Sequence, residues 1–398
     1  MKIRFLTYIV ALLLTALSCA AAPVYEFSFL TCYPGPIIYE LEGHSGLRVI
    51  VTDPEIPDFQ SDFVLDWGNF DFDTPNFVYR FTKGETDYSI GMRDTDRFLR
   101  SFSREGRKVT EQKLLLSEQE KEALANLLSE NLQPENQVYR YNYVKDNCAT
   151  RIVDILEKSV CDSLSLAPSG LGVDNFRDAM RLYHRNYPWY QFGIDLALGA
   201  SLDSPVADRA MAFSPEALER MIAGARRSDG RLIAAPPVAL NHIESSAIES
   251  PTPWYLTPMA VAMAILLLSA AFTIRDLCRG RVTKWWDAVL YGIFGVMGLI
   301  LTFLIFISVH EATSPNWLYL WLNPLCFIVT ACIWVKKLGK LVICYQFINF
   351  VLLLALLVIL ITGIQQPNAA FYPLILADMM RSVSYIYLNK CNSVTRQI

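Results

Sequence analysis

The strongest constraint on this chain is the apolar region that begins near Trp254 and continues to the C-terminus. It contains five stretches, each close to the roughly 20 apolar residues that a helix needs to cross a bilayer. These stretches cover about 254–274, 286–309, 317–335, 341–362 and 369–388. Because backbone polar groups in lipid must be satisfied within the protein, we expect residues 251–398 to form a helical membrane domain of five spans with a short tail.

The charges between these stretches predict the orientation of the domain. The first connection, "RDLCRGRVTKWWD", and the third, "KKLGK", carry Lys and Arg, whereas "HEATSPN" and "GIQQPNAA" carry none. The positive-inside rule places the two basic connections in the cytoplasm, together with the tail that bears Lys390 and Arg396. Five spans that end in the cytoplasm would put everything before Trp254 outside.

The N-terminus supports the same topology independently. Residues 1–22 begin with Lys2 and Arg4, continue with an apolar run and end in the small residues "SCAAA". This order is typical of a secretory signal peptide that is removed on export, with a retained anchor as the alternative. We therefore expect residues 23–250 to be a periplasmic domain, attached to a multi-pass protein of the bacterial inner membrane.

The exported part is mixed in its local patterns, which predicts an α+β fold. The stretch at 25–53 is typical of a strand, a turn and a strand, "FVLDWGNFDF" is a further strand, and 77–94 suggests a hairpin around Gly84. Ser117 and Glu120 then form the pattern of a capping box that opens a helix. Much of 175–227 is helical in pattern, and a polar, proline-rich linker leads to the membrane region.

The cysteines of the exported part raise a chemical question. The chain has 9 cysteines and a net charge of −4. Cys32, Cys148 and Cys161 would remain in the exported domain, so an odd number of thiols would face an oxidising compartment, and at least one would stay unpaired or pair between chains. No basic block is present there, which argues against nucleic acid as a partner. No cluster of His and Cys has metal-ligand spacing, so neither a metal nor a cofactor is expected.

Cys148 stands at a position suited to a nucleophile. In "DNCATRIVDIL", Asp146 and Asn147 occupy helix-capping positions, and an apolar helical pattern follows. The first turn of a helix has unpaired N–H groups and the positive end of the helix dipole, which favour a thiolate. Asn147 is also a candidate contact for a substrate. The simpler alternative is a small buried thiol behind an ordinary helix cap.

A reactive thiol needs a base, and the chain has 4 histidines. His310 lies at a span edge and His242 in the linker, which leaves His44 and His184. His44 enters a strand from a glycine turn, a rigid element suited to holding a base. Either of two acidic residues that follow, Asp66 or Asp71, could orient the imidazole, and the sequence does not choose between them.

Polar residues near the membrane could contact a lipid. These are His310, Asn316, Asn323 and Gln366, all toward the outer side. Hydrogen bonding between helices or anchoring at the interface is the alternative for each of them. Arg48 could bind a phosphate or form an ion pair, and Asp378 and Arg381, three residues apart, are expected to pair with each other.

Several stretches resemble the Lnb family of bacterial lipoprotein N-acyltransferases. They are "TCYPGPIIYELEGHSGLRV", "DWGNFDF", "PENQVYRYNYVKDNCATRIVDIL" and "YPWYQFGIDLALG", followed in the membrane region by "SVHEATSPNWLYLWLNPL" and "QQPNAAFYPLILA". The resemblance implies a circularly permuted papain-like or NlpC/P60-like domain in which the histidine strand precedes the cysteine helix. It makes His44 the catalytic histidine and Cys148 the nucleophile. Cys32 is the rival thiol, unless it is only packed or bonded to Cys161.

The resemblance implies acyl transfer at the outer face of the inner membrane. Cys148 would take an acyl chain from a membrane glycerolipid as a thioester and pass it to the N-terminal cysteine amine of an exported lipoprotein. Two other classes remain open. A membrane-anchored cysteine peptidase or amidase of the cell envelope would use the same pair, and a lipoprotein-binding module without activity would tolerate the loss of Cys148.

Overall fold

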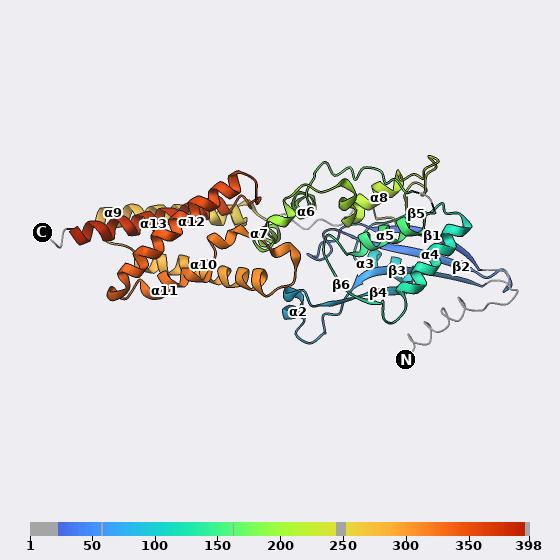
Figure 1. Ribbon diagram of the computed structural model, residues 1–398, viewed down its shortest axis with the longest axis horizontal. Helices are drawn as coiled ribbons and strands as arrows, with labels where there is room; N and C mark the ends of the chain where they lie inside the picture. The colour runs from blue at the N-terminus through green and yellow to red at the C-terminus, as the bar shows by residue number, and fades with distance from the viewer. Residues whose placement is uncertain (1–22, 57–58, 162, 244–251, 395–398) are drawn as a thin grey trace. The chain divides into compact units, whose positions relative to one another are not determined.

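The computed structural model describes residues 23–56, 59–161, 163–243 and 252–394, with side chains up to residue 390 (Figure 1). The signal peptide expected at 1–22 lies outside these residues. The chain divides into two compact units. Unit 1 contains residues up to 77, 86–173 and 207–248, and unit 2 contains 78–85, 174–206 and 249–398.

Unit 1 is built on one antiparallel sheet of seven strands, in the order β6-β4-β3-β2-β1-β5-β7. The strands are β1 (Val24–Cys32), β2 (His44–Thr52), β3 (Gln60–Asn69), β4 (Asp87–Asp94), β5 (Val109–Lys113), β6 (Val138–Arg140) and β7 (Val238–Ala239). The predicted strand, turn and strand at 25–53 is the pair β1 and β2. Alternating apolar residues on these strands give the sheet two apolar faces.

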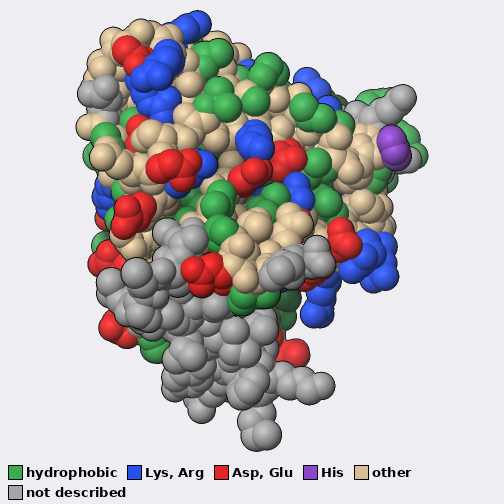
Figure 2. Space-filling model, turned by 90° about the vertical axis from the view of Figure 1, so that its right-hand side faces the viewer, with side chains coloured by type: hydrophobic (Ala, Val, Ile, Leu, Met, Phe, Trp, Pro, Cys, Tyr) green, Lys and Arg blue, Asp and Glu red, His purple; other side chains and the backbone are tan. Residues whose placement is uncertain are grey.

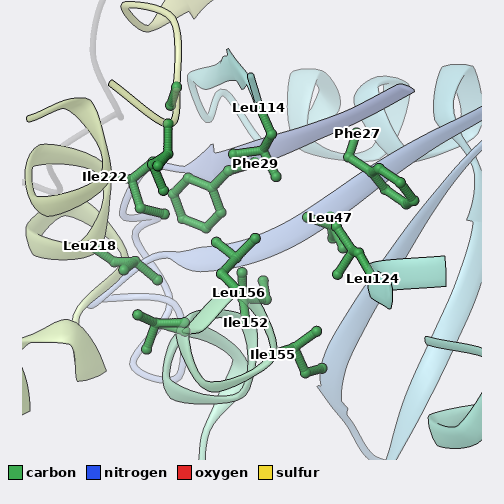
Figure 3. Close-up of a cluster of buried hydrophobic side chains, with 14 of the residues drawn as sticks. Phe27, Phe29, Leu47, Leu114, Leu124, Ile152, Ile155, Leu156, Leu218 and Ile222 are labelled. Carbon is green, nitrogen blue, oxygen red and sulfur yellow. The ribbon is translucent and has the colours of Figure 1, made fainter. Parts of the chain in front are cut away.

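Helices cover both faces of this sheet. They are α3 (Thr95–Arg104), α4 (Glu118–Asn131), α5 (Cys148–Ser159) and α8 (Pro215–Ala223), with a 3₁₀ helix at Asp208–Phe213. Apolar residues of α4, α5 and α8 pack on Phe27, Phe29 and Leu47, as Figure 3 shows for Ile152 and Leu156 of α5. On the other face, Phe98 and Phe102 of α3 form a second cluster with strand residues. Burial of the first cluster holds α5 against one face of the sheet, and burial of the second holds α3 against the other.

Two local predictions have different outcomes. The capping box at Ser117 is confirmed, because Ser117 and Glu120 bond each other's backbone at the start of α4. The hairpin around Gly84 is wrong in its first arm. Residues Phe77–Lys83 form the helix α2, and only Asp87–Asp94 is a strand. The carbonyl of Lys83 accepts the N–H of Val309, so this arm is bonded to a distant part of the chain and not to β4.

Figure 2 shows charged, apolar and other side chains on one face of unit 1. Acidic, basic and neutral side chains are intermixed there.

Unit 2 is helical. Its helices are α2 (Phe77–Lys83, of which 78–83 belong here), α6 (Phe176–His184), α7 (Pro188–Ala197), α9 (Pro258–Arg279), α10 (Lys284–Phe306), α11 (Phe327–Cys332), α12 (Gly339–Ile361) and α13 (Phe371–Val394). Three segments of the described chain are long and apolar enough to cross a membrane: Pro258–Arg279, Lys284–Phe306 and Lys336–Ile361.

The other two expected spans differ from these three. The stretch at 317–335 is broken into short 3₁₀ helices and the six-residue helix α11, because Asn323 and Pro324 interrupt it. The backbone of Asn323 packs directly on Gly298 of α10, where a Cβ would come within 2.5 Å of it. Helix α13 has 24 residues, but it carries Asp378 and Arg381, which make it less apolar than the others.

The expected pairing of Asp378 with Arg381 is wrong. Arg381 is fully buried and donates to Asp276 of α9 at 2.7 Å and to Asp287 of α10 at 2.6 Å. Asp378 instead accepts hydrogen bonds from Tyr291 and Asn349. The side chains of Asp378 and Arg381 both bond to residues of neighbouring helices. Their partners therefore depend on how the helices pack and not on the spacing of the two residues along α13. Charges inside a membrane domain require such partners.

Candidate active site

The N-terminus of α5 places Cys148 in its first turn. Asn147 is the N-cap, and its Oδ1 accepts the N–H groups of Ala149 and Thr150, each at 2.9 Å. The Thr150 hydroxyl in turn accepts the Asn147 N–H at 2.7 Å, which completes a reciprocal capping box. Cys148 is 5 % exposed. The thiol therefore lies at the positive end of a well-formed helix.

The side-chain amide of Asn147 is used fully by the protein. Its nitrogen donates to the carbonyls of Tyr143 and Phe213, at 2.9 and 2.8 Å. Asn147 was also a candidate contact for a substrate. With both ends of its amide bonded, its role in this structure is to position the helix that carries Cys148.

His44 is the first residue of β2 and is held by the turn before it. Gly43 has φ of +83°, and a Cβ there would come within 2.5 Å of the Cys32 carbonyl oxygen, so only glycine fits. His44 pairs with Cys32 across the sheet. The Phe102 ring stacks against the imidazole, with centroids 6.3 Å apart. The ring is therefore fixed by backbone register and by packing.

Asp66 orients the imidazole from the adjacent strand. His44 Nε2 lies 2.9 Å from Asp66 Oδ2, and Asp66 has no exposed side-chain area. Arg93 pairs with the same carboxylate oxygen, and the Asn69 amide donates to Oδ1 at 3.2 Å. Burial would raise the pKa of Asp66, but the hydrogen bond and charge of His44, with Arg93, outweigh burial and lower this pKa. The carboxylate is thus kept ionised.

The third member of the group is Cys148 of α5, a helix that packs on β2, and its thiol is close enough to His44 to affect the pKa of the imidazole. Burial would lower the pKa of His44, yet the charge of Cys148 and the hydrogen bond that His44 donates to Asp66 raise that pKa to about 9. The side chain of His44 is 21 % exposed. A thiol beside an imidazole that is itself held by a buried carboxylate is the arrangement expected of a nucleophilic cysteine.

Asp71 and Arg48, two further candidates from the sequence, lie apart from this group. Asp71 follows the end of β3 and its carboxylate accepts the Asp73 N–H at 2.9 Å, in an exposed turn. Arg48 donates to Asp62 and to Glu111, so it forms an ion pair across three strands. Of the two acidic candidates, only Asp66 contacts His44.

The polar candidates in unit 2 all bond to protein groups. His310 bonds the Phe81 carbonyl through Nε2 at 2.9 Å. Asn316 donates to the Leu196 carbonyl and accepts from Gln365. Asn323 caps a short 3₁₀ helix and donates to the Tyr319 carbonyl. The same holds for Gln366, which bonds Arg181 and Asp178. These bonds match the alternative given for them, hydrogen bonding within the helical unit.

The two other thiols of unit 1 are not bonded to each other. Cys32 is buried among Leu30, Val64 and Phe98, and Cys161 is exposed. Burial raises the pKa of the Cys32 thiol, with smaller effects from neighbouring charges. Cys32 is therefore held as a neutral, packed side chain.

Some residues of the site were not anticipated from the sequence. Arg93 and Asn69 complete the bonding of Asp66, and Tyr139 and Tyr141 lie near Cys148, whose charge is among the causes that raise their pKa values after burial. The alternating "YRYNY" just before the cysteine helix was a visible signal for the two tyrosines. The partners of Asp66 depend on strand pairing and had no local signal. Within the described chain, no group of three His, Cys, Asp or Glu is arranged to hold a metal.

The fold and this geometry define a membrane protein with a cysteine, histidine and aspartate constellation on an α+β domain. The family model described as the Lnb N-terminal periplasmic domain matches residues 21–182, and the one described as the Lnb transmembrane domain matches residues 250–392. Together they cover most of the chain in the family's order, and the chain belongs to the Lnb family. Comparison with curated proteins and with solved structures found no match.

Membership in this family has coarse functional consequences. The N-terminal domain is periplasmic and the C-terminal domain is integral to a membrane, as the two family descriptions state. The Lnb domains indicate an enzyme that processes lipoproteins at a membrane.

Proposed function

We propose that the protein is a lipoprotein N-acyltransferase that uses Cys148 as its nucleophile. The observation that carries this proposal is the bond between His44 and Asp66, with His44 in reach of a thiol at the start of α5. A structural cysteine needs no oriented imidazole. In contrast, a nucleophile needs a base that is itself held by a third group.

In the first half-reaction, the Cys148 thiolate attacks the ester carbonyl of a membrane glycerolipid. The C–S bond forms, the ester C–O bond breaks, and His44 gives its proton to the departing glycerol oxygen. The products are a thioester on Cys148 and a lysolipid. The cap of Asn147 occupies the N–H groups of Ala149 and Thr150, which leaves the Cys148 N–H as the donor of this turn for the oxyanion.

In the second half-reaction, the α-amine of a lipoprotein's lipidated N-terminal cysteine attacks the thioester. The C–N bond forms, the C–S bond breaks, His44 takes a proton from the amine, and the thiolate of Cys148 is restored. Asp66 stabilises the imidazolium in both steps and keeps the ring oriented. Transfer through one covalent intermediate predicts ping-pong kinetics.

The finer architecture belongs to the same proposal. The order of histidine strand, aspartate strand and cysteine helix supports a permuted papain-like or NlpC/P60-like domain. We propose five membrane crossings in the inner membrane, in which α13 and the broken stretch at 317–335 accompany the three clear spans. Helix α13 is long enough, at roughly 36 Å for 24 residues. A domain held at the bilayer surface suits a lipid donor better than a soluble one.

The thioester is the direct test of this mechanism. The full chain in detergent, mixed with phospholipid and no lipoprotein, should gain one acyl group that peptide mass mapping places on Cys148 and that hydroxylamine removes. Cys161→Ala, which removes an exposed thiol elsewhere in unit 1, should still form it. Acyl-enzyme in Cys148→Ala, or on another cysteine, would refute the proposal.

A further inference from the structure

Four large apolar side chains stand exposed on segments that adjoin the strands of the candidate active site. Ile37, Ile38 and Tyr39 lie in the loop between β1 and β2, and Phe72 follows β3; they are 45, 53, 57 and 56 % exposed. We call these four residues the apolar rim. The loop that leads to His44 and the segment that follows Asp66 therefore both contribute to it.

Of the two acidic side chains in this loop, Glu40 and Glu42, the one next to Tyr39 is turned away from solvent. Glu40 is 8 % exposed, and its carboxylate lies 3.8 Å from the guanidinium of Arg107. Glu40 is therefore turned inward, whereas Ile37, Ile38 and Tyr39 are turned outward. Uncovered apolar patches of this kind mark binding surfaces, because exposing them to water is unfavourable.

Aromatic rings connect the apolar rim to the interior of unit 1. Tyr39 contacts Phe72 at 5.8 Å between centroids, and Phe72 contacts Phe70 at 4.8 Å. Phe70 contacts Tyr88 at 5.3 Å, and Tyr88 stacks on Tyr141 at 4.5 Å. The rings form a continuous apolar track, from side chains more than half exposed to the buried Tyr88.

The inner end of this track lies at Cys148. Tyr141 packs over Gly68 of β3, where a Cβ would come within 3.2 Å of the ring. The next residue, Asn142, exchanges two backbone hydrogen bonds with Asp146, which brings Tyr141 beside the start of α5. Burial raises the pKa of Tyr141, and the charge of Cys148 raises it further, as its proximity requires.

We propose that the apolar rim and its aromatic track bind the hydrocarbon chain of the acyl group that is transferred to Cys148. This inference rests on the proposed function and specifies its donor subsite. An acyl chain is linear and begins at the carbonyl that the thiol attacks, so a chain bound to Cys148 must leave the site along an apolar path. The rings provide such a path, and an end that opens to solvent admits chains of different lengths.

The test separates chain binding from chemistry. Cys148 of the full chain in detergent is acylated by p-nitrophenyl esters of two to twelve carbons, and release of p-nitrophenolate gives the rate. The test variant is Ile38→Ser with Phe72→Ser, and Ile38→Ser alone serves if the double variant unfolds early. The control is Val238→Ser on β7, an apolar residue that is 63 % exposed and lies at the opposite edge of the sheet from β6.

The ratio of wild-type to variant rate is compared at each chain length, so that partition of the ester into detergent cancels. We expect a ratio near one for the acetate and a ratio that rises with length to at least tenfold, since a buried methylene contributes roughly a fourfold factor. Val238→Ser should keep a ratio near one throughout.

Three other outcomes would overturn the inference in different ways. If esters react with Cys148 but the ratio of wild-type to variant rate does not change with chain length, the subsite is refuted and the proposed function still holds. If no ester reacts with Cys148, the proposed function fails and the inference fails with it. A rim variant that loses activity only toward phospholipid in bilayers, with a flat ratio for dissolved esters, would make the rim a contact for the membrane surface instead.

Discussion

The imidazole of His44 connects the charges that the proposed chemistry requires. Its Nε2 bonds a carboxylate with no exposed area, and the same ring reaches a thiol at a helix N-terminus. Asp66 and Cys148 each favour the protonated imidazole of His44, and together they outweigh the cost of burying its charge. The activity of the site should therefore depend on Asp66 and on pH in defined ways.

Asp66→Asn should reduce acyl transfer by about 10²–10⁴-fold, because the carboxylate no longer orients His44 or stabilises its charge. The matched control is Asp71→Asn, a nearby carboxylate in an exposed turn, which should stay within about twofold of wild type. The measurement is the single-turnover rate of thioester formation. Equal rates for Asp66→Asn and wild type would remove Asp66 from the site.

The pKa of His44 also predicts how stability depends on pH. Its value is about 9 in the folded protein against 6.5 for an ordinary histidine. Protonated His44 thus stabilises the folded state fully below pH 6.5, and this contribution is lost as pH rises through about 9. The midpoint of thermal unfolding should fall more between pH 6.5 and 9.5 in wild type than in His44→Gln.

A variant of an exposed histidine provides the control for this measurement. His242→Gln should keep the wild-type dependence of the unfolding midpoint on pH. If His44→Gln and wild type change in parallel over this range, the charged state assigned to His44 is wrong.

At the scale of single elements, helix starts were readable from sequence, and partners across strands were not. Each capping signal spans only four residues, Ser117 to Glu120 and Asn147 to Thr150, so local pattern predicted both helix starts. The choice of Asp66 over Asp71 depends on where β3 ends and on its pairing, which sets Asp66 opposite Gly46, two residues beyond His44. That register is a property of the whole sheet.

The membrane region gives a similar lesson. Apolar composition predicted the location of α9, α10 and α12 well, because each forms an uninterrupted helix. The apolar composition of residues 317–335 as a whole did not reveal that the helix is broken at Asn323 and Pro324. The dipeptide itself was a local signal for it.

Asn147→Ala should destabilise the protein by about 1–2 kcal/mol, since it removes a helix cap. Ser117→Ala removes the cap of α4 and should have a similar effect on the unfolding midpoint. Only Asn147→Ala should also slow thioester formation, at least tenfold, because it loosens the turn that holds Cys148. If the two variants retain the same activity, the cap of α5 has no role in positioning the thiol.

At the scale of the whole molecule, the two units do not follow the chain in two blocks. Residues 78–85 and 174–206 group with the membrane helices, although they precede the linker in sequence. Arg181 of α6 bonds Gln366, and His310 bonds Phe81, so these two polar candidates hold the segments to the helical unit. These partners could not be predicted from local sequence patterns, because each bond joins residues more than 180 positions apart.

The proposed topology predicts opposite exposure of two native thiols. Cys161 of unit 1 should react with a membrane-impermeant maleimide on cells with a permeable outer membrane, whereas Cys278, in the basic first connection, should react only after the inner membrane is opened. Both thiols are exposed in the structure, so burial does not confound the comparison. Labelling of Cys278 in intact cells would reverse the orientation that the positive-inside rule assigns.

The central claim is N-acylation of lipoproteins through Cys148, and its most direct test is the intact mass of a lipoprotein's N-terminal peptide. The peptide is taken from cells that lack the native activity and carry either wild type or Cys148→Ala at matched expression. We predict one additional fatty acyl group on the α-amine with wild type and none with Cys148→Ala. An unmodified amine with wild type, or equal acylation with both, would contradict the account.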